Sequence, residues 1–263
     1  MSSVLSVAPL SGWPAATPDP FLFCVYHNDV YPKGNSKMEA PRKGNGADFD
    51  PAAPYRMYHG DRIPGFPQHP HRGFETITAT MDGVIDHSDS HGNAGRYGSG
   101  DLQVKIGSSC EVAGFLSPFS LKLIALLFSS SHPLLSSSLI TLFSFQWMTA
   151  GSGVVHGEMF PLINESGPNK NRFFQIWLNL PARDKMTDPK FAMHWAEDVI
   201  KFSDPSGAMV TVFAGTFEDQ IALPPCPASW AADSEHDVAI WHITLPPGSA
   251  IDLPVSFKKN CNR

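Results

Sequence analysis

His69-Pro-His-Arg-Gly-Phe-Glu-Thr76 and Val154-Val-His-Gly-Glu-Met159 are the two stretches around which the chain is organised. Each contains two metal-ligand residues spaced two apart, a His-x-His in the first and a His-x-Glu in the second. Successive side chains of a β-strand point to opposite faces, so each pair would lie on one face of a strand. Three imidazoles and one carboxylate suit a divalent ion such as Fe(II) and leave coordination positions open. The candidate metal ligands are therefore His69, His71, His156 and Glu158.

Other residues compete for these roles. Glu75 is the main alternative for the carboxylate, because it also lies at an even offset from His71. His69-Pro-His71 could instead be a turn without a metal. Among the remaining histidines, His59 is a candidate for the pocket or for a contact behind a ligand. The histidines expected to be surface or hydrogen-bonded residues are His87, His91, His194, His236 and His242.

Three segments of the chain resemble the pirin family, a branch of the cupin superfamily. They are His69–Thr76, Gly100-Asp-Leu-Gln103 and Trp147-Met-Thr-Ala-Gly-Ser-Gly-Val-Val-His-Gly-Glu-Met159, and Phe174–Leu180 extends the match. The resemblance implies an all-β fold, the double-stranded β-helix or jelly-roll barrel of cupins, with one iron ion in the N-terminal barrel. It also implies that the ligands are His69, His71, His156 and Glu158, which selects Glu158 over Glu75.

The same resemblance implies two functions of different kinds. One is quercetin 2,3-dioxygenase-type activity on a flavonol-like small molecule with O2 and Fe(II), in which Glu158 is the ionisable ligand placed to accept the substrate hydroxyl proton. The other is an iron-dependent nuclear transcriptional co-regulator that binds a transcription-factor protein and turns over no substrate. A third interpretation is an incorrectly spliced gene model without a stable product.

Composition narrows the class of protein. The chain has 263 residues, 42% of them hydrophobic, which is enough for a sizeable core. Its 24 prolines and 21 glycines favour a turn-rich all-β protein. The net charge of −6, without a long Lys/Arg cluster, argues against direct binding of nucleic acid. The N-terminus lacks the pattern of a secretion signal, so we expect an intracellular protein, in the nucleus or cytoplasm, with reduced cysteines.

The family resemblance, placed on the pattern of apolar runs and turn residues, implies a domain order. We expect a lead-in at 1–19, an N-terminal cupin domain at 20–180, an inter-domain segment at 181–206 and an incomplete C-terminal cupin domain at 207–263. Asp82-Gly83 predicts a hairpin between strands Glu75–Met81 and Val84–His87. Other predicted strands are Phe21–Tyr26, Phe173–Leu180, Gly207–Gly215, Val238–Leu245 and Ala250–Val255, and predicted loops are Pro32–Pro54 and Ser88–Gly100.

One segment interrupts the family resemblance. In Val104–Gln146, 25 of the 43 residues are Ser, Leu or Phe. Pyrimidine-rich DNA encodes these residues, and the codons of Val104-Lys105 and of Phe143–Gln146 can be written as a splice donor and acceptor. We interpret 104–146 as a translated intron, and the tail 255–263 as a second read-through. A membrane span is the rejected alternative, because no uninterrupted apolar run reaches about 18 to 20 residues.

Overall fold

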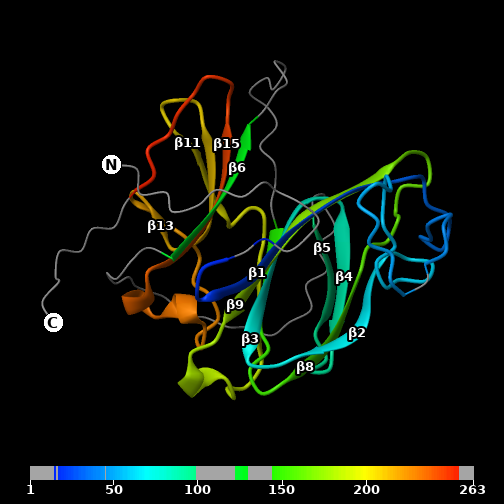
Figure 1. Cartoon of the computed structure of the whole chain (residues 1–263), viewed down its shortest axis with the longest axis horizontal. Helices are drawn as coiled ribbons and strands as arrows, with labels where there is room; N and C mark the ends of the chain where they lie inside the picture. The colour runs from blue at the N-terminus through cyan, green and yellow to red at the C-terminus, as the bar shows by residue number, and fades with distance from the viewer. Residues whose placement is uncertain (1–14, 16, 45, 99–121, 130–143, 255–263) are drawn as a thin grey trace, which may run out of the picture.

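A computed structural model of the chain describes residues 15, 17–44, 46–98, 122–129 and 144–254 (Figure 1). Its architecture is built almost entirely from β-strands. The helical elements in these ranges are three short 3-10 helices. They are η1 (Ala182–Asp184), η2 (Trp230–Ala232) and η3 (Ser234–His236).

The central element is a five-stranded antiparallel sheet with the order β1-β9-β3-β7-β10. A four-stranded antiparallel sheet with the order β2-β8-β4-β5 faces it. Side-chain hydrogen bonds join the two sheets across the space between them, from β3 and β9 to β8 and from β7 to β4. The strands are β1 (Phe21–Tyr31), β2 (Gly65–His71), β3 (Phe74–Asp82), β4 (Val84–Asp89), β5 (Ala94–Gly98), β7 (Ser144–Thr149), β8 (Val154–Met159), β9 (Asn169–Asn179) and β10 (Lys190–His194).

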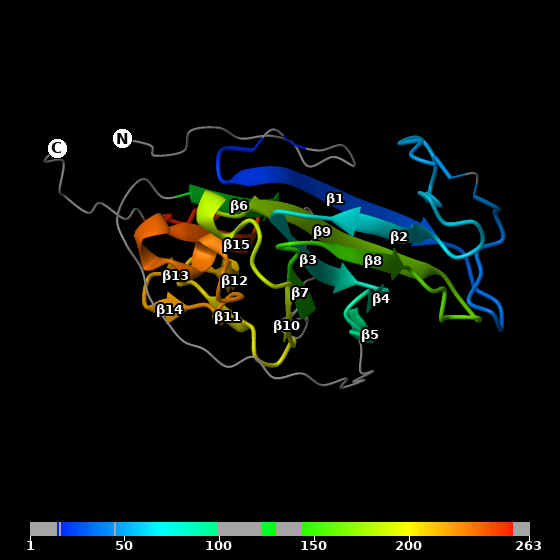
Figure 2. The ribbon, with the colours of Figure 1, turned by 90° about the horizontal axis from the view of Figure 1, so that it is seen from below.

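A third sheet packs on the outer face of the five-stranded one. Its order is β11-β12-β15-β6, and β6 runs parallel to β15 whereas the other pairs are antiparallel. Figure 2 shows β12 and β15 toward one end of the molecule and β2 and β8 toward the other. The strands are β6 (Lys122–Ser129), β11 (Ile200–Ser203), β12 (Met209–Ala214) and β15 (Val238–Leu245), with the separate pair β13 (Thr216–Phe217) and β14 (Gln220–Ile221).

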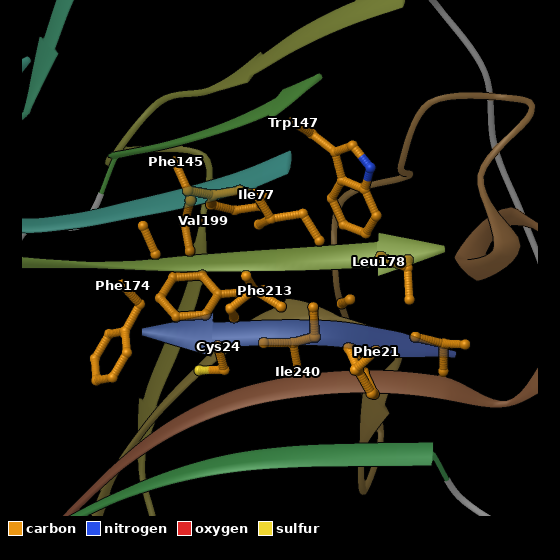
Figure 3. Close-up of a cluster of buried hydrophobic side chains, with 14 of the residues drawn as sticks. Phe21, Cys24, Ile77, Phe145, Trp147, Phe174, Leu178, Val199, Phe213 and Ile240 are labelled. Atoms are coloured by element: carbon orange, nitrogen blue, oxygen red, sulfur yellow. The ribbon is translucent and has the colours of Figure 1, made fainter. Parts of the chain in front are cut away.

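Both faces of the central sheet are buried, and they differ in polarity. On β3, Thr76 and Thr78 face the four-stranded sheet, whereas Ile77 and Ala79 face the third sheet, as the period of two requires. The apolar face forms the main core, in which Ile77, Phe145, Trp147, Phe174 and Leu178 pack with Phe213 and Ile240 (Figure 3). The polar face is therefore free to carry the candidate site.

The predicted hairpin at Asp82-Gly83 is wrong. Gly83 has φ +82 and does turn the chain there, but β3 pairs with β7 and β9 while β4 pairs with β5 and β8. The turn thus carries the chain from one sheet to the other. The loop predicted at Ser88–Gly100 is also partly wrong, because the glycine-rich run Ala94–Gly98 forms β5 by pairing with β4. Non-local pairing outweighs its weak strand propensity.

Two further segments differ from the prediction. No strand forms at 250–254, and residue 255 lies outside the described ranges. Within the predicted inter-domain segment 181–206, β10 joins the central sheet and β11 joins the third one. The pattern missed both strands because each is short and only partly buried.

Of the predicted insertion 104–146, the structure describes 122–129 and 144–146. Residues 122–129 are β6, which pairs with β15 along its whole length. Ser144, Phe145 and Gln146 begin β7, with Phe145 in the main core and Gln146 facing the other sheet. The translated-intron interpretation remains a prediction, as does the read-through at 255–263. Across the part of the chain that the structure covers, no helix is long and apolar enough to span a membrane.

Candidate metal centre

Three neighbouring strands, β2, β8 and β4, direct their polar side chains into the space between the two sheets. In the strand register His69 lies opposite His156, and His87 lies opposite Glu158. Residues two apart share a face, so His71 joins His69, and Glu158 joins His156. The strand geometry inferred from the two sequence stretches therefore holds.

The four predicted ligands fall into two overlapping groups. Ligand atoms of His69, His71 and His156 all lie within 4.8 Å of one another. A second group with the same limit contains His156, Glu158 and His87. His156 is the residue that both groups share. Glu158 is grouped with His87 and not with His69 or His71, so the four predicted ligands do not form a single group.

The imidazoles of the first group are close enough together to bind one ion. Ring centroids are separated by 4.8 Å for His69 and His71, 4.5 Å for His69 and His156, and 4.8 Å for His71 and His156. His71 and His156 are buried, whereas His69 is partly exposed. The group thus has one side toward solvent and the rest inside the barrel.

Burial keeps the inner histidines neutral. Desolvation, with smaller contributions from neighbouring histidines, lowers the pKa of His71 and of His156 from 6.5 to about 3. Neutral imidazole is the form that binds a metal, because the ligand needs a free lone pair. His156 Nε2 is buried and has no hydrogen-bond partner in the described structure. An unpartnered ring nitrogen beside two further histidines fits a transition-metal ion, which would satisfy it.

Two residues of the central sheet hold the Glu158 carboxylate. Gln175 Nε2 donates a hydrogen bond to Oε2 at 2.9 Å, and Thr78 Oγ1 donates one to Oε1 at 3.3 Å. All three side chains are buried. These neutral donors orient the carboxylate without a competing cation, which leaves its charge available to an ion.

Glu75, the alternative carboxylate, lies on the other face of β3. Its Oε1 accepts hydrogen bonds from Trp147 Nε1 at 3.0 Å and Thr149 Oγ1 at 2.7 Å, and its Oε2 accepts one from Ser229 Oγ at 2.6 Å. Complete burial raises the pKa of Glu75 to about 7, although these hydrogen bonds act in the opposite direction. Glu75 therefore joins the central sheet to the loop before η2, and it does not face the histidines.

His87 is the residue that the sequence interpretation missed. It was expected to be a surface or hydrogen-bonded histidine, and it is 4% exposed with contacts to Asp89 and Gln146, so the hydrogen-bonded alternative is correct. The expectation did not include its place in the second ligand group. The sequence did contain a signal for this position. His87 lies two residues after Ile85, so both side chains share one face of a short strand, and a histidine stands where an apolar residue is usual. His59 is exposed, and its Nδ1 contacts the carbonyl oxygen of Gly46.

The other histidines set aside at the sequence level have different environments. His194 and His242 are buried, and desolvation lowers the pKa of His194 to about 4 and that of His242 to about 3. His194 stacks on Phe145 with a centroid distance of 4.2 Å. His91 is exposed and His236 is partly exposed. Neither His194 nor His242 belongs to the two ligand groups.

Two facing antiparallel sheets around a polar interior with clustered histidines define an all-β protein of the cupin type. Residues 19–109 match the Pirin family model. Together with pirin-like relatives, this match shows that the chain carries a Pirin-family domain.

The relatives span bacteria and plants. A "Pirin-like protein" of Caulobacter vibrioides is 28% identical over 216 residues, covering 81% of this chain and 59% of the relative. A Vibrio cholerae protein named "Putative quercetin 2,3-dioxygenase" is 30% identical over 190 residues, which cover 68% of this chain and 51% of that relative. A crystal structure of quercetin 2,3-dioxygenase from Acinetobacter baumannii is 26% identical in sequence with a TM-score of 0.44. The alignment covers 78% of this chain and 48% of that protein. The chain thus spans about half the length of the relatives it matches.

Proposed function

We propose that this chain binds one Fe(II) ion through His69, His71, His156 and Glu158 and acts as a quercetin 2,3-dioxygenase-type enzyme on a flavonol. The observation that carries the proposal is the group of three close imidazoles, two of them buried and neutral, with an unpartnered Nε2 on His156. Relatives named for quercetin 2,3-dioxygenase activity support the reaction class.

The donor set decides what kind of ion suits the site. Imidazole nitrogen with one carboxylate oxygen is a set that non-haem iron accepts, and it leaves coordination positions open. Fe(II) bound there would supply the Lewis acidity and the redox chemistry that a reaction between O2 and a chelating flavonol needs. Neutral imidazoles add no positive charge, so the single carboxylate would leave the site with a net charge near +1.

Glu158 would accept the proton of the flavonol hydroxyl. Its Oε2 accepts the shorter hydrogen bond from Gln175, and its Oε1 accepts the longer one from Thr78, while the buried Tyr97 also interacts with this carboxylate. The bond to Oε1 is the weaker of the two at 3.3 Å, and a carboxylate so oriented can act as a general base.

Aromatic side chains surround the histidines and suit a planar substrate. The His71 ring lies 5.0 Å from Phe74 and 5.4 Å from Trp177 between centroids, and His69 lies 6.2 Å from Phe66. His69 is the most exposed of the candidate ligands, so a flavonol would approach from its side. Aromatic walls with a few polar groups are typical of small-molecule sites.

The test begins with the full chain reconstituted with Fe(II) without oxygen. We expect one iron per chain, and loss of iron in His71→Ala but not in His236→Ala, which alters a histidine outside both ligand groups. On addition of quercetin and air, the wild type should consume both O2 and quercetin. Glu158→Gln should lower turnover by about 100-fold or more, the usual effect of removing a general base.

Three results would change the proposal. Absence of stoichiometric iron would refute the site. Glu158→Gln with full iron and full turnover would place the base elsewhere. Iron binding without consumption of quercetin would favour a non-enzymatic, iron-dependent co-regulator.

A further inference from the structure

Two histidines of the second ligand group, His87 and His156, form a chain of polar contacts with Asp89, which lies outside that group. His87 Nε2 lies 3.4 Å from Asp89 Oδ2, and His87 Nδ1 lies 3.4 Å from His156 Nδ1. The side chains of His87 and Asp89 are 1% and 2% exposed. Water therefore cannot replace these contacts, and each ring nitrogen of His87 must find its partner within the protein.

Asp89 is itself fixed by the turn that follows β4. Its Oδ1 accepts the backbone N–H groups of His91 and Asn93 at 2.9 and 3.0 Å, and its Oδ2 accepts Asn93 Nδ2 at 2.8 Å. An ionised carboxylate only accepts hydrogen bonds, so His87 must carry its proton on Nε2 to donate to it.

The other nitrogen of His87 is consequently an acceptor. Gln146 Nε2 donates to His87 Nδ1 at 3.1 Å, which requires a lone pair at that atom. This single lone pair also faces His156 Nδ1 at 3.4 Å, so Gln146 and His156 share it as donors. His156 can then be the donor of this contact only in the tautomer that carries the proton on Nδ1. That tautomer leaves Nε2, the unpartnered atom, without a proton.

We propose that Asp89 and His87 are positioning residues that fix the tautomer of His156, so that its Nε2 presents a lone pair for a metal ion. The inference rests on the proposed metal site and deepens it. Metal-bound histidines usually donate their other ring N–H to a protein acceptor, and loss of that acceptor typically weakens binding 10- to 100-fold. Here the acceptor is a second histidine, which a carboxylate orients in turn.

The first measurement needs no metal. Nitrogen-15 chemical shifts of the imidazoles in the metal-free full chain distinguish the two neutral tautomers. We expect His156 with its proton on Nδ1 and His87 with its proton on Nε2. The opposite tautomer at either residue would overturn the proposal, even if the chain binds a metal by the proposed ligands.

The second measurement is titration with Co(II), read by its absorption spectrum. His87→Ala should weaken binding 10- to 100-fold. His87→Gln should recover much of the loss, because its amide oxygen can accept the His156 N–H. Asp89→Asn, which can still cap the turn, should show a smaller loss than His87→Ala. His91→Ala is the matched control, because it removes an exposed imidazole from the same turn and keeps the backbone bond to Asp89.

These variants also separate positioning from direct ligation. If His87 were itself a ligand, His87→Gln would change the shape of the Co(II) spectrum, and that result would overturn the proposal. Unchanged affinity in His87→Ala would overturn it as well. If the wild type binds no Co(II), the proposed metal function fails. The tautomers of the metal-free chain still decide whether Asp89 and His87 fix the tautomer of His156. Should His87→Ala not fold, His87→Gln and the nitrogen shifts remain decisive.

Discussion

Gln175 on the central sheet reaches across the barrel and donates a hydrogen bond of 2.9 Å to Glu158 Oε2 on the facing sheet. The bond links the carboxylate of the candidate metal site to a different strand from those that carry its histidines. Orientation of Glu158 therefore depends on how the two sheets are docked.

Gln175→Ala should weaken metal binding. Removal of the amide donor frees the carboxylate to rotate, and loss of such a partner typically lowers affinity about tenfold or more. Titration of the variant with Fe(II) or Co(II) measures the change. Gln68→Ala, which alters an exposed glutamine on β2, should bind as the wild type does. Equal affinities in the two variants would show that Glu158 needs no support from β9.

Acid should destabilise the metal-free chain through its buried histidines. The pKa of His194 falls from 6.5 to about 4 on folding, so between these values the unfolded chain binds more protons than the folded one. The free energy of unfolding then decreases as pH falls through this window, by about 1.4 kcal/mol per pH unit for each such histidine. His194→Phe keeps the stack on Phe145 and should reduce the slope by that amount in urea unfolding. The exposed His91→Ala should leave the slope unchanged.

Glu75 should have the opposite pH dependence. Its pKa rises from 4.5 to about 7 on folding, so its protonated form is favoured in the folded chain and stability is lost as pH rises through about 7. Glu75→Gln should match the wild type near pH 5 and exceed its stability at pH 8 by up to about 3 kcal/mol. Urea unfolding at the two pH values tests this, with the exposed Glu165→Gln as control. A variant less stable than the wild type at pH 8 would contradict the expectation.

Deletion of 104–146 should leave a chain that still binds metal. The residues before Trp147 would change from Ser144-Phe145-Gln146 to Asp101-Leu102-Gln103, which keeps an apolar residue at the core position of Phe145 and a glutamine at the position that contacts His87. Deletion of 103–146 is the matched control. It removes one more residue, so the residues placed before Trp147 shift by one position and their side chains exchange the two faces of the sheet.

Co(II) affinity and the melting temperature measure both deletions. We expect binding by the first and loss of binding by the second. The first deletion also removes β6 from the edge of the third sheet, so its melting temperature reports how much that strand contributes. Transcript reads that join the codons of Gln103 and Trp147 would support the translated-intron interpretation, and reads that cover 104–146 would refute it.

Local pattern was sufficient for those features that lie within single strands. The alternation around Ile77, the apolar run before Leu180 and the spacing of His69 with His71 predicted a strand or a shared face, and β3, β9 and β2 have these properties. A period of two defines which side chains share a face, and neighbouring residues alone determine it. The family resemblance, carried by the two ligand stretches, predicted the cupin-type barrel.

Tertiary structure decided everything that depends on which strands meet. Only the pairing of β4 with β8 brings His87 beside Glu158, although Asp82-Gly83 suggested a hairpin with β3. Only the contact with Ser229, in the loop before η2, shows that Glu75 faces away from the histidines. Sheet order and the inward face follow from contacts between residues far apart in the chain, and such contacts leave no local period in the sequence.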